Sequence, residues 1–375
     1  MRIAYISLSS PFNRASWSGI PWYSHREILR RFPDTHVIET PRMDWLIDQT
    51  SNLKLERAGI QIRRSRWLAE YYSRAVDRAL EKLQPDVVIA IAAAHKIAYI
   101  NPKWPLVYVA DAMYATVIDY YDKYANLPAR VRARGNRMQA SMLERADRIL
   151  LSSQWAVETA KKVYTLEDHR LRMVPMGANL DEDPGYQPPD IDRPLSLLFV
   201  GYDWERKGGD LVLETWRELR KRTGNAEFHI VGARPESATG LQGVHLHGRI
   251  NKSDRHDYAR LIELYAKSHF FVMPSRQEAY GIVLCEAAAF GRPAVVQATG
   301  GVTTIVQDGE TGLILPEGAT PDQLADRILQ AWSDKEYYTR LCETSRERFL
   351  GVLNWNQWGE SAGTIINALV EEGRR

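Results

Sequence analysis

The stretch FFVMPSRQEAYGIVLCEAAAFGRPAVVQATGGVTTIVQDGETGLIL, residues 270–315, decides the fold. The apolar residues Phe270–Met273 predict a strand that is buried on both faces. Residues 275–280 follow as a loop, and Gly281 opens a predicted helix that runs to about residue 290. A second apolar run at Ala294–Gln297 predicts the next strand. A strand, a helix and a strand in this order are typical of a parallel sheet with a crossover helix.

The same alternation of short apolar runs and longer amphipathic stretches extends over the whole chain. Strands that are buried on both faces of a parallel sheet are apolar throughout, so we expect an α/β fold with doubly wound parallel sheets. The strands expected in the first half are Ile3–Leu8, His36–Glu39, Val87–Ala92, Leu106–Ala110, Ile149–Ser152 and Met173–Pro175. Those expected in the second half are Leu197–Gly201, Glu227–Val231, Val244–Leu246, Phe270–Met273, Ala294–Gln297 and Leu313–Leu315.

A proline-rich segment divides the chain into two predicted domains. Residues 181–194, DEDPGYQPPDIDRP, have the composition of a linker. The 375 residues suffice for two domains of about 100–200 residues each. We expect an N-terminal Rossmann-like domain at residues 1–180 and a C-terminal one at residues 195–354. The last segment, residues 355–375, predicts a helix that docks back on the first domain.

Composition and charge exclude several classes of protein. The chain carries 49 Lys and Arg against 47 Asp and Glu, so the basic footprint of a nucleic-acid-binding protein is missing. Its 2 cysteines are too few for a disulfide framework. The longest apolar run, Val87–Ala94, is far below the ~18 residues of a membrane-spanning helix, and Met1–Ser10 lacks the features of a signal peptide. We expect a cytoplasmic protein with no nucleic-acid partner.

Two carboxylates bracket the start of the helix that Gly281 opens. Glu278 lies in the loop, and Glu286 lies inside the helix, where its side chain leans back toward the helix N-terminus. The free N–H groups at Tyr280, Gly281 and Ile282 favour an anion, most naturally a phosphate. A phosphate between two hydroxyl-binding acids matches a nucleotide sugar, whose diphosphate lies between two polyol rings. Such ligands bind at the carboxyl ends of the strands in an open α/β sheet.

The spacing of these residues resembles the donor site of the retaining GT-B glycosyltransferases of family 4. That family carries a strand, P-S, a loop, E-x7-E, G-x-P-V, a G-G turn and D-G-x-T-G. The matching residues are Pro274-Ser275, Glu278 and Glu286, Gly291-Arg292-Pro293-Ala294, Gly300-Gly301 and Asp308-Gly309-x-Thr311-Gly312. The resemblance implies a GT-B fold, with two Rossmann-like doubly wound domains that face each other across a cleft. It also implies a retaining glycosyltransferase whose C-terminal domain binds a nucleotide-diphosphate sugar.

The resemblance assigns roles to the donor-site residues. It implies that Glu278 meets hydroxyls of the donor sugar, that Glu286 meets the nucleotide ribose, and that the N–H groups around Gly281 hold the phosphates. The segment LFVGYDWERKGGD, residues 198–210, is similar to the turn that opens the second domain of the family. Within it, Lys207 matches the lysine that reaches the diphosphate as a point charge.

The chain departs from the family pattern at two positions. Tyr202 stands where relatives usually carry Arg, and Thr304 stands where many carry Glu. Arg206 could supply the positive charge that Tyr202 does not. Arg249 and Ile250 lie in the loop whose contacts are expected to select the nucleotide base.

Two residues of the first domain join the predicted site. Gly19, in the turn Ser18-Gly19-Ile20, matches a turn of the family that faces the donor diphosphate, where glycine permits close approach of the backbone. Asp111 follows a strand where relatives often place His near the reacting carbon. It could orient an acceptor hydroxyl or act as a base, or it could cap the following helix. The expected catalytic residues are therefore Glu278, Lys207, Arg206 and Asp111.

No metal and no bound cofactor are expected for this chemistry. Two D-x-D patterns, at Asp181–Asp183 and Asp190–Asp192, lie in the linker and not at a strand end, which favours solvated acids over a metal site. The expected partners are a nucleotide sugar and a saccharide, lipid-linked or small-molecule acceptor, in polysaccharide or glycoconjugate synthesis.

Peripheral contact with the inner face of the membrane is an open alternative. A basic run could meet acidic lipid headgroups or an anionic acceptor, although a solvated helix face is the favoured interpretation. The run consists of Arg130, Arg132, Arg134 and Arg137. Two other functions are compatible with the pattern: a nucleotide-sugar epimerase of the same architecture, and a catalytically inactive GT-B-like scaffold.

Overall fold

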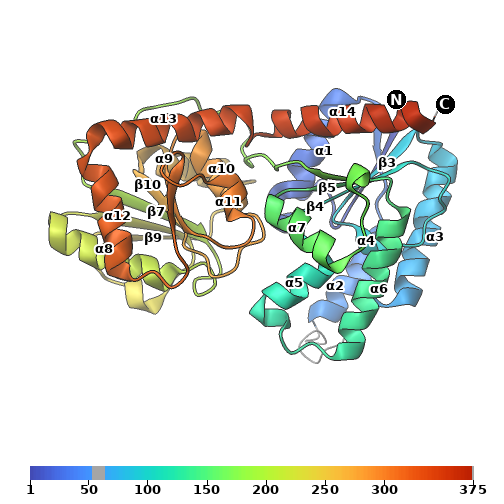
Figure 1. Cartoon of the computed structure of the whole chain (residues 1–375), viewed down its shortest axis with the longest axis horizontal. Coiled ribbons are helices and arrows are strands. Elements are labelled where there is room, and N and C mark those ends of the chain that lie inside the picture. Colours follow the sequence, from blue (N-terminus) through green and yellow to red (C-terminus); the bar gives the residue numbers. More distant parts are fainter. Residues whose placement is uncertain (53–63, 374–375) are drawn as a thin grey trace. The chain divides into compact units, whose positions relative to one another are not determined.

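A computed structural model of the chain describes residues 1–52 and 64–373. The chain divides into two compact units, which Figure 1 shows in colours that follow the sequence. The first unit comprises Met1–Pro175 and Trp358–Arg375, and the second comprises Met176–Gln357. The chain therefore passes between the units twice, at residues 175–176 and at residues 357–358.

The first unit is built on a six-stranded parallel sheet with the order β2-β1-β3-β4-β5-β6. Its strands are β1 (Ile3–Ser7), β2 (Thr35–Val37), β3 (Val87–Ile91), β4 (Leu106–Ala110), β5 (Arg148–Leu151) and β6 (Leu171–Met173). Every residue of β1, β3 and β4 is buried, as expected for strands covered by helices on both faces.

Amphipathic helices cover this sheet and close its core. Val76 and Leu80 of one helix pack in a single apolar cluster with Ile6 and Val88 of the strands. The α-helices are α1 (Ile20–Arg31), α2 (Pro41–Asn52), α3 (Arg66–Leu83), α4 (Ala94–Ile97), α5 (Tyr114–Tyr120), α6 (Ala129–Arg145) and α7 (Gln154–Val163). Short 3-10 turns are η1 (Ser16–Gly19), η3 (Asp122–Tyr124) and η4 (Asp168–Arg170).

The C-terminal helix α14 (Trp355–Gly373) ends the chain on the first unit. Its residue Gly359 lies so close to α1 that a Cβ there would stand 2.2 Å from Glu27 Oε1. The carboxylate of Glu27 is almost fully buried and pairs with Arg31 at 2.6 Å. Trp358 and Ile366 are buried along the same helix. The last two residues of the predicted segment, 374–375, lie outside the described residues.

The second unit contains another six-stranded parallel sheet, with the order β12-β11-β10-β7-β8-β9. Its strands are β7 (Ser196–Gly201), β8 (Glu227–Gly232), β9 (Val244–Gly248), β10 (Phe270–Val272), β11 (Ala294–Gln297) and β12 (Gly312–Leu315). The chain builds outward from β7 in one direction and then from β10 in the other. The order therefore reverses between β7 and β10, which is the point where open α/β sheets bind ligands.

Helices pack on this sheet in pairs, α8 against α12 and α10 against α13 (Figure 1). They are α8 (Gly209–Thr223), α9 (Arg255–Lys267), α10 (Ile282–Ala289), α11 (Val302–Ile305), α12 (Pro321–Ser333) and α13 (Lys335–Gly351), with the 3-10 turn η5 (Glu236–Ala238). Side chains satisfy the free N–H groups at several helix starts: Asp254 caps α9, and Thr320 and Gln323 form a capping box at α12.

The doubly wound α/β fold expected from the sequence is confirmed, and each of the twelve expected strands overlaps a strand of the structure. The largest shift is at β6, which ends at Met173 where the apolar pattern predicted Met173–Pro175. Proline lacks the N–H that would continue the ladder, so the strand ends before it. Among the described residues, no helix is both long and apolar enough to cross a bilayer.

The segment 181–194 lies on the second unit and forms neither helix nor strand. Several residues of the unit hold it: Asp183 pairs with Arg346 at 2.6 Å, and the carbonyl of Asp190 lies 2.8 Å from His269 Nε2. Within the segment, the side chains of Asp183 and Asp190 also accept hydrogen bonds from the backbone N–H groups of Gly185 and Asp192. Just before it, Asn179 accepts a hydrogen bond from the indole of Trp355 at 2.9 Å.

Two glycines at the ends of α8 give a matched test of loop packing. Gly208, at the N-cap, and Gly224, at the C-cap, both have left-handed backbones, with φ of 72° and 84°. A Cβ on Gly208 would stand 2.2 Å from the carbonyl oxygen of Pro274, whereas a Cβ on Gly224 would meet no atom within 4 Å. We expect Gly224→Ala to cost about 1 kcal/mol of unfolding free energy from backbone strain alone.

We expect Gly208→Ala to cost about 3 kcal/mol, because overpacking adds roughly 1–3 kcal/mol to the same strain. Urea denaturation of both variants measures the difference. Equal losses for the two variants would show that the close approach of Gly208 to Pro274 does not hold in solution.

Candidate donor-binding site

Two loops meet at the point where the strand order of the second unit reverses. One loop, residues 202–208, follows β7, and the other, residues 273–281, follows β10. Because β7 and β10 are hydrogen-bonded neighbours in parallel register, their carboxyl ends emerge side by side. Any side chains that these loops carry are thereby brought together, although they are about 70 residues apart in sequence.

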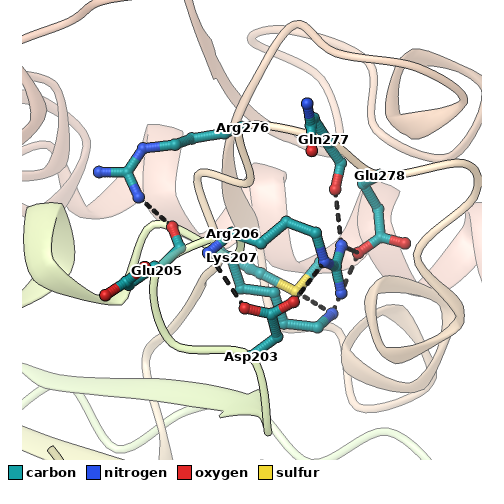
Figure 2. A network of polar contacts seen from close by, with 8 residues as sticks. Asp203, Glu205, Arg206, Lys207, Arg276, Gln277 and Glu278 are labelled. Carbon is teal, nitrogen blue, oxygen red and sulfur yellow. Dashed lines mark hydrogen bonds and ion pairs between the residues drawn. The ribbon is translucent and has the colours of Figure 1, made fainter. Parts of the chain in front are cut away.

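Lys207, Arg206 and Glu278 form an ion-pair cluster between the two loops (Figure 2). Lys207 Nζ lies 3.0 Å from Glu278 Oε2, and an Arg206 Nη atom lies 3.5 Å from the same oxygen. The side chains of Lys207 and Glu278 are only 14% and 12% exposed. The structure thus joins three of the four residues expected to be catalytic, and it places both cations on one carboxylate.

Arg206 is held in this position by two further bonds. Its guanidinium donates to the carbonyl of Gln277 at 2.6 Å and to the carboxylate of Asp203 at 2.9 Å (Figure 2). Its charge is therefore directed across the gap between the loops and not into solvent. Asp203 was not predicted from the sequence as a site residue.

Glycine makes room for the Lys207 side chain. The aliphatic stem of Lys207 passes over Gly201, where a Cβ would stand 2.3 Å from Lys207 Cδ. The ammonium group also lies 3.3 Å from the sulfur of Met273. Gly201, the last residue of β7, is therefore required for steric reasons, because a larger residue would displace the side chain of Lys207.

Arg276 is a second residue that sequence reasoning missed. Its backbone N–H donates to the carbonyl of Arg206 at 2.8 Å. Its guanidinium donates to the carbonyl of Glu205 (Figure 2) and to Asp210 Oδ2, the latter at 2.7 Å. Thr299 donates in turn to the carbonyl of Arg276. Arg276 thus ties the two loops together. In the sequence, only the position of Arg276 between Pro274-Ser275 and Glu278 pointed to a role in the site. That position did not indicate which residues Arg276 contacts.

The N-terminus of α10 lies directly beyond Glu278. Gly281, the N-cap residue, is left-handed with a φ of 94°. The Tyr280 side chain is buried and donates to the carbonyl of Met176 at 2.6 Å, and burial raises the pKa of its phenol. Tyr280 therefore offers the site its backbone, while its ring anchors the loop. Within the described part of the chain, the N–H groups of Tyr280, Gly281 and Ile282 have no acceptor.

Glu286 lies in a separate network from Glu278. Its carboxylate is fully buried and accepts from Tyr265 Oη at 3.0 Å and from Lys252 Nζ. Lys252 also lies 3.3 Å from the carbonyl of Asn179. A buried carboxylate needs such partners because its desolvation is expensive. Lys252 is 34 residues away in sequence, so no local pattern could identify it as the partner of Glu286.

Arg249 and Ile250 follow β9 at the same edge of the sheet. The Arg249 guanidinium lies over the ring of Tyr202, with its carbon 5.1 Å from the ring centroid. Tyr202 is one of the exposed large aromatic residues, at 62%. Ile250 is buried. The residue that departs from the family pattern, Tyr202, therefore contacts a residue expected to bind the donor.

The two expected site residues of the first unit lie at carboxyl ends of its strands. Gly19 follows β1 and is the left-handed N-cap of α1, with a φ of 90°. Trp17 and Ser18 before it also have positive φ, at 43° and 56°. Such strain costs about 1–3 kcal/mol per residue and is concentrated at functional sites.

Asp111 follows β4. The N-cap residue of the next helix, α5, is Met113, whose own side chain makes no capping hydrogen bond. The roles of Asp111 considered from the sequence stay predictions.

Residues 194–334 match the family described as Glycosyl transferases group 1. An α-D-kanosaminyltransferase from Streptomyces kanamyceticus is 31% identical over 41% of this chain and 40% of its own length. A D-inositol 3-phosphate glycosyltransferase from Geodermatophilus obscurus is 28% identical over 62% of this chain and 55% of its own length. The chain thus spans about half the length of these curated relatives.

Solved structures match over nearly the full chain. Sucrose-phosphate synthase from Thermosynechococcus elongatus has a TM-score of 0.71 at 17% identity, covering 99% of this chain and 100% of that one. HepE from Anabaena, solved in complex with UDP, has a TM-score of 0.69 at 13% identity, covering 98% of this chain and 100% of that one. At these identities the likeness shows the fold. The GT-B fold expected from the sequence is therefore confirmed, and residues 194–334 are similar to the glycosyl transferases group 1 family, as the resemblance implied.

Proposed function

We propose that this protein is a retaining glycosyltransferase that moves a sugar from a nucleotide-diphosphate sugar to an acceptor hydroxyl. The observation that carries the proposal is the cluster of Lys207, Arg206 and Glu278 beside the N-terminus of α10, at the reversal of strand order. The family match of residues 194–334 supports it. So does the UDP bound by one structural relative.

The donor diphosphate would compete with Glu278 for the two cations. In the structure Lys207 and Arg206 both face one carboxylate oxygen. A diphosphate carries more charge than a carboxylate and would also receive the N–H groups around Gly281. Once the cations turn to the diphosphate, Glu278 is released to accept hydrogen bonds from hydroxyls of the donor sugar.

The same cations would lower the barrier to transfer. As the bond between C1 of the sugar and the phosphate oxygen breaks, negative charge builds on the diphosphate, and Lys207 and Arg206 are positioned to stabilise it. The acceptor oxygen bonds to C1 on the face that the diphosphate leaves, and its proton passes to a phosphate oxygen. Asp111 would orient the acceptor hydroxyl. Because protein cations meet the diphosphate charge, this mechanism needs no metal.

In this proposal, the first unit binds the acceptor. Saccharide, lipid-linked and small-molecule acceptors all present a hydroxyl, and the related transferases named above act on different ones. A lipid-linked acceptor would bring the protein to the inner face of the membrane from the cytoplasm. The basic run considered for contact with lipid headgroups lies on α6, and one of its residues, Arg132, forms an ion pair with Asp119.

Replacing Glu278 by Gln tests the proposal. The variant keeps the shape of the side chain but loses the negative charge, so it accepts hydroxyl hydrogen bonds more weakly. We expect transfer to fall by about 100-fold or more, the loss that is typical when one preorganised group that stabilises the transition state is removed. Proton NMR of reactions with a panel of nucleotide sugars, in the presence of EDTA, measures the rate and shows whether the product anomer is retained.

The matched control is Glu317→Gln, which changes an exposed glutamate of the same unit and should leave the rate unchanged. Full activity of Glu278→Gln would refute the site. An inverted anomer would refute the retaining mechanism but not the site.

Lys252 provides a second test, aimed at Glu286. If Glu286 binds the ribose, Lys252 keeps this buried carboxylate paired while no donor is present. Lys252→Met would leave it with Tyr265 alone, and we expect a loss of about 3 kcal/mol in unfolding free energy. Lys267→Met, which removes an exposed helix pair with Glu263, should cost less than about 0.5 kcal/mol. Urea denaturation measures both, and equal small losses would contradict the buried pairing.

A further inference from the structure

Three histidines and a glutamate gather on β8 and β9, away from the loops of the donor site. Glu227 and His229 lie two residues apart on β8, and His245 and His247 lie two residues apart on β9. Residues two apart in a strand point to the same face, and His229 pairs with His245 across the ladder. Glu227 and His245 lie at the amino-terminal ends of these strands, whereas the donor loops follow carboxyl ends.

The side chains of this cluster converge. The rings of His229 and His245 stack with centroids 4.6 Å apart and planes 15° from parallel. Glu227 Oε2 lies 3.7 Å from His229 Nε2. One potential ligand atom from each of Glu227, His229 and His245 lies within 4.8 Å of the other two. Atoms that share a tetrahedral zinc ion at about 2.1 Å are roughly 3.4 Å apart, so small side-chain rotations would suffice.

A hydrogen bond to His247 can fix the orientation and the tautomer of the His229 ring. His229 Nδ1 lies 3.1 Å from His247 Nε2, within hydrogen-bond distance. If Nδ1 donates the proton, Nε2 of His229 keeps its lone pair on the side of Glu227. Metal-binding histidines commonly hold their second nitrogen in such a bond.

We propose that Glu227, His229 and His245 bind one divalent transition-metal ion of the zinc type. Two imidazoles and a carboxylate suit Zn²⁺ and its chemical relatives Co²⁺ and Ni²⁺, with water completing the coordination. The positive charges of Arg193, near His229, and Arg260, near His247, would repel a metal ion. The negative charge of the Glu227 carboxylate counteracts this repulsion. The ion would clamp β9 to β8 at the open edge of the sheet, and it takes no part in the proposed transfer.

Calorimetric titration of Zn²⁺ into the full-length, tag-free protein tests the site, after chelator has been removed by dialysis. We expect one ion per chain for the wild type. His245→Gln should weaken binding by at least about tenfold. His245 is exposed, so this variant should fold even if His229→Gln does not. Cobalt titration supplies a second readout, because Co²⁺ held by these ligands in a tetrahedral site absorbs visible light.

The matched control is His256→Gln, which removes an exposed histidine of the same unit and should bind Zn²⁺ like the wild type. Unchanged affinity in His245→Gln would overturn the proposal. Equal weakening in His245→Gln and His256→Gln would also overturn it, because it would indicate scattered surface binding. Failure of the glycosyltransferase assay has no bearing on this result, since the two sites share no residue.

Discussion

The parallel pairing of β7 with β10 is the constraint on which the rest of the site depends. These strands are adjacent in the sheet but separated by two other strands in the sequence, because the chain reverses its direction of growth between them. Open α/β sheets bind their ligands at such a point, just outside the carboxyl ends of the strands. Lys207 and Glu278 occupy the loops that follow β7 and β10. Their contact is therefore a direct consequence of sheet topology.

Electrostatics explains why the cluster of Lys207, Arg206 and Glu278 is stable and can still exchange Glu278 for a ligand. The Lys207–Glu278 pair is mostly buried, and breaking such a pair by removing one partner typically costs about 3–5 kcal/mol. Replacing the carboxylate by a diphosphate instead keeps the cations paired. The buried Glu286 is balanced in the same way by Lys252. Each carboxylate that the resemblance links to the donor is thus paired with a cation.

Much of this arrangement could be predicted from the sequence. Apolar runs identified the strands, since burial on both faces leaves few polar positions in most of them. The short spacing from Pro274 to Gly281 located the loop and the helix start. The donor-binding residues of the candidate site could also be proposed from the sequence, because Glu278, Gly281 and Lys207 lie within local motifs. The domain boundaries and the roles of individual site residues stay predictions.

The contacts that long-range packing creates could not be predicted. Lys252 meets Glu286, and Arg276 ties the loop after β7 to the loop after β10, through bonds that no local spacing encodes. The segment 181–194 looked like a free linker because of its prolines, but composition does not show that Asp183 reaches Arg346. The histidines of β8 and β9 alternate visibly in the sequence, yet only the ladder shows that the two strands are neighbours.

The most direct test of the donor site is calorimetric titration of UDP, GDP and ADP into the wild type and Lys207→Met, with EDTA present. We expect one of the three nucleotides to bind at a single site without metal, and Lys207→Met to weaken that binding by at least about tenfold, the loss of one charge-assisted contact of about 1.5–3 kcal/mol. Lys221→Met, which removes an exposed lysine of the same unit, should bind as the wild type does. Absence of binding by folded protein, or binding that Lys207→Met leaves unchanged, would contradict a donor site built on Lys207 and Glu278.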